Sequence, residues 1–145
     1  MSSLRGALLR CAVAMATVLA GTAVAVGATG APAHAGAPRC NGAGFVRNIN
    51  AVQLDVPLYF FSGGSTVLCV MSRGDRGVDV GQLQWTLNYC YGERLKLDDD
   101  FGSLTRSALI RAQQRERVGA DGVYGPETAM AMRFPQPGPG GCGRL

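Results

Sequence analysis

Two stretches of twelve residues share one pattern, and this internal repeat constrains the fold more than any other feature of the sequence. Residues 98–109 read DDDFGSLTRSAL, and residues 121–132 read DGVYGPETAMAM. The shared form is D-x-x-[F/Y]-G-x-x-T-x-x-A-[L/M]. The aspartate can fix a turn, the aromatic residue can anchor the loop, and the glycine allows an unusual backbone conformation before a helix. The repeat therefore predicts two loop-to-helix joints of the same design.

Helical spacing of apolar residues surrounds the two joints. A first helix is predicted over residues 80–91, with Gly92 at its end, because apolar residues recur there on one face. Residues 103–117 and 126–134 predict a second and a third helix. Pro126 suits the first position of the third helix, where its missing N–H has no helical partner.

The segment before the helices predicts a small β element. Residues 52–56 alternate between apolar and polar, residues 62–65 are a turn signal, and residues 66–71 favour a second strand. Pro57 should end the first strand or place it at a sheet edge. The apolar run 59–61 is expected to pack in the core, with a surface site as the alternative.

These elements predict a mainly α chain in which a three-helix bundle follows a small, disulfide-closed β element. The expected organisation is a signal peptide at residues 1–35, an extension with the β element at 36–71, the helical domain at 72–134 and a Pro/Gly-rich tail at 135–145.

The first segment has the layout of a secretory signal. Arg5 and Arg10 precede an apolar run over residues 11–26, and residues 33–35 place small side chains at the −3 and −1 positions of a cleavage site. An uncleaved membrane anchor is the alternative, but glycines and a proline break the end of the run. No later apolar stretch approaches the ~18 residues of a membrane helix. We therefore expect a secreted, extracellular protein with no stable membrane anchor after cleavage.

Charge and histidine content narrow the classes of function. Without Arg5 and Arg10 the chain has 12 basic and 10 acidic residues, a net charge of about +2 with no basic run, so nucleic acid is not an expected partner. The sole histidine, His34, lies in the predicted signal. Residues 36–145 therefore lack the imidazole of the usual Ser-His-Asp and Cys-His arrangements and of catalytic zinc sites.

Four cysteines follow the predicted signal: Cys40, Cys69, Cys90 and Cys142. An even count in a small exported chain predicts two disulfides. Three pairings are open, and we favour Cys40–Cys69 with Cys90–Cys142 because each would staple one segment to itself. Zinc is disfavoured because no C-x-x-C pair exists, and the acidic run 98–100 lacks the spacing of a calcium loop. No metal or other cofactor is expected.

The repeat belongs to a longer series of positions with a recognisable pattern. These are Gly74, Gly77, Val80, Leu83, Gln84, Leu87, Gly92, Asp98, Phe101, Gly102, Thr105, Ala108, Leu109, Gln113, Asp121, Gly122 and Thr128. Over residues 73–134 they resemble the helical peptidoglycan-binding domain of bacterial cell-wall proteins. The resemblance implies a three-helix bundle that attaches proteins to peptidoglycan. Asp99, Ala112 and Arg117 depart from the family pattern, which usually has glycine, an aromatic residue and often glycine there. The composition and the Ala-rich leader look similar to actinobacterial exported proteins.

Five side chains are candidate ligand contacts: Gln84, Trp85, Asn88, Tyr91 and Tyr124. Gln84, Asn88 and Tyr91 fall on or beside one helical stripe, and amides and a phenol suit the amides, carboxylates and hydroxyls of peptidoglycan. A bond from Gln84 to loop backbone is at least as well supported, because buried amides usually serve backbone groups. For Trp85 and Tyr124, packing is favoured over ligand contact.

The expected function is non-catalytic binding to peptidoglycan in the cell wall. The alternative is a secreted interaction or inhibitor protein that acts on a wall enzyme, with the β element and tail as its contact surface. A minor alternative is a small wall glycosidase that works with two carboxylates. The 110 residues after the signal leave little room for a catalytic cleft beside a binding module.

Overall fold

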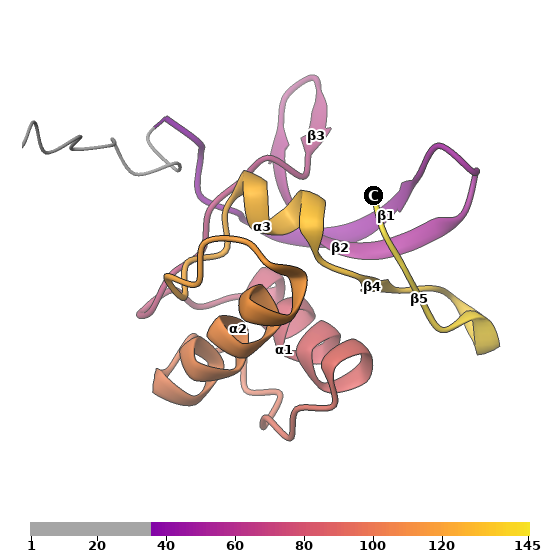
Figure 1. The fold of residues 1–145 in the computed structure, drawn as a ribbon. Helices are drawn as coiled ribbons and strands as arrows, with labels where there is room; N and C mark the ends of the chain where they lie inside the picture. Colours follow the sequence, from indigo (N-terminus) through magenta and orange to yellow (C-terminus); the bar gives the residue numbers. More distant parts are fainter. Residues whose placement is uncertain (1–35) are drawn as a thin grey trace, which may run out of the picture.

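The computed structural model describes residues 36–145, and Figure 1 shows how they are arranged. The predicted signal peptide, residues 1–35, lies outside the described residues. In chain order the elements are β1 (Gly42–Arg47), β2 (Gln53–Phe61), β3 (Gly64–Thr66), α1 (Val78–Tyr91), α2 (Ser103–Glu116), α3 (Pro126–Ala131), β4 (Phe134–Pro135), the 3-10 turn η1 (Gly138–Gly140) and β5 (Cys142–Gly143). Within this part of the chain, none of the helices has the length and apolarity that crossing a bilayer requires.

The predicted fold class, a mainly α three-helix bundle, is wrong. Of the described residues 34% are helical and 25% lie in strands or bridges, which form two sheets. The third helix is only six residues long and ends at Ala131, because Met132 is already extended. Pro135 also disfavours the helical conformation at Phe134. The chain instead turns there into a short antiparallel hairpin of β4 and β5, so the fold mixes helices with sheets.

Strand β2 is the centre of the larger sheet, whose order is β1-β2-β3. Phe45 lies opposite Asp55 in the register, while the neighbouring Leu54 is fully buried, so alternate residues face the core and the outside. Pro57 does not end the strand, because β2 continues to Phe61, but it does lie where β2 is locally an edge. It is tolerated because β3 pairs only from Tyr59 onward, which leaves β2 a single neighbour at the proline.

Several features of the β region differ from the sequence prediction. Strand β1 was not predicted, and the expected strand at 66–71 is reduced to the end of β3 and isolated bridges at Val70 and Met71. The expectation that residues 59–61 pack in the core is also wrong for two of them, since Phe60 and Phe61 are 45% and 51% exposed. The tip of the β2–β3 hairpin therefore presents aromatic surface to solvent.

One hydrophobic core joins the sheet, the helices and the tail hairpin. Its buried side chains include Leu54, Val56 and Leu58 from β2, Val80, Leu83 and Leu87 from α1, Ala108, Leu109 and Ala112 from α2, and Phe134 from β4. In Figure 1 the sheet lies above α1 and α2, and β4 runs from the end of α3 beside β2. The segments on either side of the helices are thus packed parts of the fold.

Both predicted disulfides are present. Cys40–Cys69 joins the residues ahead of β1 to the loop after β3, and Cys90–Cys142 joins the last turn of α1 to β5. Sequence separations of 29 and 52 correspond to about 4 kcal/mol each in the chain-entropy model. The second bridge fixes the tail against the C-terminal half of α1.

Candidate binding site

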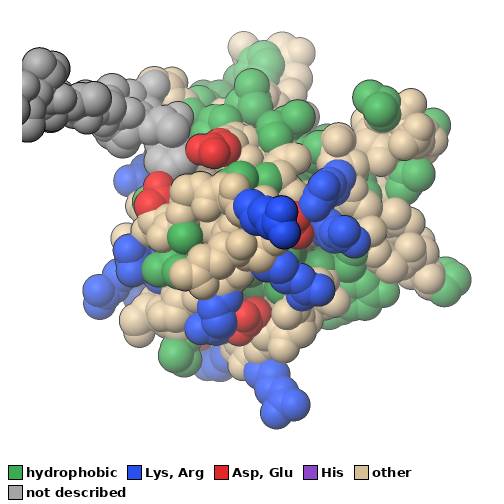
Figure 2. Space-filling view, in the orientation of Figure 1, with side chains coloured by type: hydrophobic (Ala, Val, Ile, Leu, Met, Phe, Trp, Pro, Cys, Tyr) green, Lys and Arg blue, Asp and Glu red, His purple; other side chains and the backbone are tan. Residues whose placement is uncertain are grey.

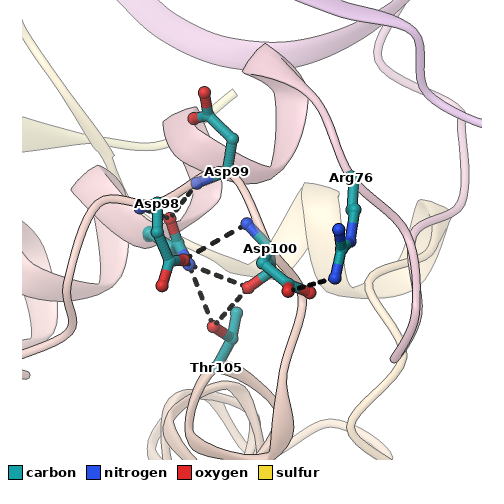
Figure 3. A network of polar contacts seen from close by, with 6 residues as sticks. Arg76, Asp98, Asp99, Asp100 and Thr105 are labelled. Carbon is teal, nitrogen blue, oxygen red and sulfur yellow. Dashed lines mark hydrogen bonds and ion pairs between the residues drawn. The ribbon is translucent and has the colours of Figure 1, made fainter.

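The first joint is organised by the amide of Gln84, which is 1% exposed. Its Nε2 donates to Asp98 Oδ1 at 2.8 Å, to the carbonyl of Asp100 at 3.0 Å and to Thr105 Oγ1 at 3.2 Å, while its Oε1 accepts two backbone N–H groups. Figure 3 shows Asp98, Asp100 and Thr105 converging, with Arg76 reaching Asp100 from the other side. Because both ends of this amide are engaged, Gln84 holds the loop onto the helices.

The second joint repeats this network around Gln113, which is fully buried. Its Nε2 donates to Asp121 Oδ1, to the carbonyl of Val123 and to Thr128 Oγ1, each at 3.0 Å. Its Oε1 accepts the backbone N–H of Gly122 at 2.9 Å. The twelve-residue sequence repeat is therefore a repeated hydrogen-bonding unit, and a glutamine from the preceding helix completes each copy.

The three departures from the family pattern have a place in this geometry. Asp99 adopts a left-handed conformation with φ 57°, close to the 72° of its counterpart Gly122, and aspartate tolerates this region better than most residues. Arg117 ends α2 in the same region, where glycine is common. Ala112 is 1% exposed and belongs to the core.

The acidic run at the first joint is occupied by protein groups. The hydrogen bond from Gln84, followed by the backbone N–H of Asp100, lowers the pKa of Asp98 below its usual range. Asp100 pairs with Arg76 at 2.8 Å. Among residues 36–145, no group of three or more His, Cys, Asp and Glu side chains is placed to hold a metal ion.

Two further candidates make hydrogen bonds within the fold. Asn88 donates to the carbonyl of Leu95 at 2.9 Å and accepts its N–H at 2.7 Å. The hydroxyl of Tyr91 donates to Glu116 at 3.0 Å and accepts the backbone N–H of Arg133 at 2.7 Å. Burial raises the pKa of Tyr91 well above its usual value. These side chains connect α1 to the loop after it and to the chain that follows α3.

The structure places Tyr124 in the core. Its side chain is fully buried, as is that of Phe101, the corresponding residue of the first joint. The Tyr124 hydroxyl has no hydrogen-bond partner within residues 36–145, and burial raises its pKa far above the usual value. Both aromatic residues of the repeat therefore anchor their loops.

Trp85 is the one exposed side chain among the five candidates. It is 42% exposed and stacks on Tyr89, one helical turn further on, with ring centroids 5.3 Å apart and an interplanar angle of 24°. The pair lines a cavity of about 250 Å³ together with Phe45, Asp55 and residues 135–138. We refer to this cavity as the aromatic groove.

Sequence reasoning missed most of the aromatic groove. Tyr89 could have been found, because it stands four residues after Trp85 and so shares its helical face. Phe45, Asp55 and the tail residues gave no such signal, since they reach the groove only through the β1–β2 register and the hairpin of β4 and β5.

A second cavity, of about 200 Å³, lies at the first joint and is called the joint cavity below. It is lined by Gln84, Leu95, Lys96, Asp98, Asp100 and residues 102–105. Several of its polar groups, including those of Gln84, Asp98 and Thr105, already bond one another. The joint cavity thus offers fewer free polar groups than its lining suggests.

Charge is unevenly spread over the molecule. Figure 2 shows Lys and Arg side chains scattered over the helical part of the visible face, while hydrophobic side chains gather at its upper and right-hand margins. Some of the cations are paired, as in Arg111 with Glu93 at 2.5 Å, and both Arg133 and Arg144 approach Glu116. Such exposed cations mainly form a solvated surface, because ion pairs in water contribute little.

A family model matches the helical region of the chain. Residues 76–132 match the family model described as "Putative peptidoglycan binding domain". The helical region is therefore similar to peptidoglycan-binding domains. The match confirms the resemblance inferred from the repeat. Phe45, Asp55 and residues 135–138 of the aromatic groove lie outside the matched range.

Two solved structures are similar to parts of the chain. One is the crystal structure of the Burkholderia AP3 phage endolysin, 42% identical over 41% of this chain and 22% of that chain, with a TM-score of 0.39. The other is a peptidoglycan-binding protein from Clostridioides difficile in complex with glutamine hydroxamate, 26% identical over 59% of this chain and 53% of that chain, with a TM-score of 0.44. The chain thus spans only part of the length of either protein.

Proposed function

We propose that this chain is a non-catalytic protein that is exported and binds peptidoglycan in the bacterial cell wall. One observation carries the proposal: residues 76–132 match a peptidoglycan-binding family, and both glutamine-centred joints of that region are complete. A complete set of joints supports a working binding module.

The carboxylates of the two cavities support a non-catalytic role. A glycosidase needs a protonated acid and a second carboxylate about 5–10 Å away across the bond it cleaves. Among the residues that the structure describes, Asp55 is the single carboxylate that lines the aromatic groove. In the joint cavity, Asp98 has a lowered pKa and Asp100 is paired with Arg76. In the described part of the chain, the carboxylates of these two cavities thus favour binding over hydrolysis.

The two disulfides support export. Disulfides persist in oxidising compartments and are rare in the cytosol, and this small fold contains two. The predicted signal at residues 1–35 agrees with that inference. N-terminal sequencing of protein recovered from the culture medium should give Gly36 as the first residue, whereas retention of residues 1–35 would contradict cleavage.

A second candidate function is binding to a wall enzyme. It is favoured by Phe60 and Phe61, which are exposed at the β2–β3 hairpin, outside the family match. Adjacent exposed aromatic residues are enriched at protein interfaces. A pull-down from culture fluid that depends on these two side chains would support this role.

Purified sacculi test the main proposal. The oxidised protein should sediment with sacculi and stay in the supernatant with cellulose, and the turbidity of the sacculi should not change. Clearing of the suspension would overturn the non-catalytic assignment. Full recovery in the supernatant at low salt would overturn peptidoglycan binding.

A further inference from the structure

The aromatic groove combines residues from three separate parts of the chain. Helix α1 supplies Trp85 and Tyr89, the β1–β2 pair supplies Phe45 and Asp55, and the segment 135–138 closes the third side. Only the α1 residues lie within the family match. The groove is therefore a feature that this chain adds to the helical region.

Three exposed aromatic side chains dominate its surface. Phe45, Trp85 and Tyr89 are 58%, 42% and 45% exposed, although large aromatic side chains usually contribute to the core. Trp85 and Tyr89 stack at 24° and so present neighbouring ring surfaces. Such rings suit the apolar C–H face of a pyranose, which has polar groups around its edge.

The walls of the groove are held in place without a ligand. Gln82 of α1 donates to the carbonyl of Asp55 at 2.9 Å and so fixes the helix to β2. The tail is held by the Cys90–Cys142 disulfide and by the buried Phe134. A preformed site spends less binding free energy on ordering its side chains.

Polar groups are available beside the rings. The Gln136 side chain lies so close to the last strand that a Cβ on Gly143 would meet its Nε2 at 2.7 Å. The same residue also lines the groove. Its amide and the carboxylate of Asp55 can serve hydroxyl and acetamido groups of a bound sugar.

The charge of the groove selects against anions. Asp55 is the one ionisable acid among the described residues that line it, and no Lys or Arg is among them. Asp55 is half-buried, so its carboxylate is screened less than one on open surface and disfavours a second negative charge nearby. A neutral sugar fits this groove better than a carboxylate-bearing sugar or the carboxylates of a peptide stem.

We propose that the aromatic groove binds a neutral N-acetylhexosamine unit of the glycan strand, stacked on Trp85 and Tyr89. This assignment rests on the proposed binding to peptidoglycan and names the part of the polymer that is recognised. The volume of the groove is about 250 Å³, just below the ~300–1,000 Å³ of pockets that hold drug-sized molecules. A groove of this size suits a small ligand such as a single sugar unit.

Trp85 allows a direct test, because it is the only tryptophan in the chain. Titration of the oxidised protein with N-acetylglucosamine trisaccharide should change the tryptophan fluorescence in a saturable way. Tyr89→Ala and Phe45→Ala should each raise the Kd by about tenfold, since each removes a contact surface for the sugar. Phe61→Ala is the matched control, because it removes an exposed aromatic ring outside the groove.

A variant at Asp55 tests the selection against charged sugars. N-acetylmuramic acid, which bears a carboxylate, should bind at least about fivefold more weakly than N-acetylglucosamine at neutral pH, and Asp55→Asn should narrow that difference. Equal affinity of the wild-type protein for the two sugars would contradict the selection of neutral units. Thermal unfolding of each variant separates lost binding from lost folding.

The sacculus assay distinguishes failure of this proposal from failure of the proposed function. If the wild-type protein and the Tyr89→Ala and Phe45→Ala variants sediment equally well with sacculi, and the trisaccharide leaves the fluorescence unchanged, the groove assignment is overturned and peptidoglycan binding stands. If the wild-type protein does not sediment with sacculi, the proposed function fails, and the trisaccharide titration still decides whether the groove binds the sugar.

Discussion

At the scale of single residues, two buried glutamines account for the repeat. Gln84 and Gln113 each use one amide to hold an aspartate, a backbone carbonyl and a threonine hydroxyl. The aspartate and threonine of the sequence pattern are thus explained by a partner that lies outside the twelve-residue motif. Residue spacing within the repeat alone could not identify that partner.

Loss of the Gln113 amide should strongly destabilise the protein. Gln113→Ala leaves the N–H of Gly122 and the carbonyl of Val123 without this partner, and unsatisfied buried groups cost about 1–3 kcal/mol each. We expect the free energy of unfolding to fall by about 2–4 kcal/mol in urea denaturation. Gln114→Ala, at an exposed position beside it, should change it by less than about 0.5 kcal/mol. Equal effects would refute the structural role of Gln113.

The buried hydroxyl of Tyr124 should be a cost to the fold. Tyr124→Phe removes a polar group that has no partner, so we expect stability to rise by about 1 kcal/mol. Phe101→Tyr is the reciprocal change at the first joint and should lower stability by at least about 1 kcal/mol, because it buries a hydroxyl. The melting temperatures of the two variants measure both changes in stability. A clear fall in the melting temperature of Tyr124→Phe would show that the hydroxyl stabilises the fold.

Asp98 should make the first joint sensitive to acid. Its pKa is lowered in the folded state, so its contribution is present above the unfolded value of about 3.9 and is lost as the pH falls through the folded pKa. Asp98→Asn should lose less stability than the wild-type protein between about pH 5 and pH 2. Asp99→Asn is the control, because Gln84 bonds the backbone N–H of that residue. The melting temperature measured as a function of pH compares the stability that each protein loses on acidification. Parallel curves for Asp98→Asn and the wild-type protein would contradict a role of the Asp98 carboxylate.

At the scale of elements, the sequence predicted what local patterns determine. The first two helices begin and end close to their predicted limits, with Gly92 and Arg117 in left-handed conformations at the two C-termini. The sequence did not predict the early end of the third helix or the hairpin of β4 and β5. The backbone of Phe134 is extended because Pro135 follows it and because its side chain packs in the core. A two-residue strand has no periodicity that a sequence pattern could reveal.

The candidate site was predicted less well than the helices for a related reason. Gln84, Asn88 and Tyr91 do share a helical stripe, but their polar groups bond other parts of the fold. The groove residues Phe45 and Asp55 depend on a strand register that forms between distant segments. Local spacing identifies a helix face, whereas a groove between elements depends on tertiary packing.

The tail hairpin should depend on its disulfide. Replacing Cys90 and Cys142 with serine removes a cross-link between residues 52 positions apart. We therefore expect the free energy of unfolding to fall by about 4 kcal/mol. The loss should also weaken trisaccharide binding, because residues 135–138 form one wall of the aromatic groove. Urea denaturation and fluorescence titration measure the two effects. Unchanged affinity in a folded double variant would show that the tail wall makes no contribution.

At the scale of the whole molecule, a region that matches a peptidoglycan-binding family is embedded in a larger fold. The matched residues 76–132 share one core with the β1–β2–β3 sheet before them and the tail hairpin after them. The added segments complete the aromatic groove on one side of α1. The repeat thus holds the two joints together, whereas the added surface supplies the groove that we propose as the binding site.

The most direct test of the central claim is a binding isotherm of the oxidised protein on purified sacculi at low and at physiological salt. We predict saturable binding with a Kd that changes by less than about tenfold between the two conditions, because the groove is neutral or weakly acidic and the net charge of residues 36–145 is only about +2. Absence of saturable binding, or binding that disappears at physiological salt, would contradict it.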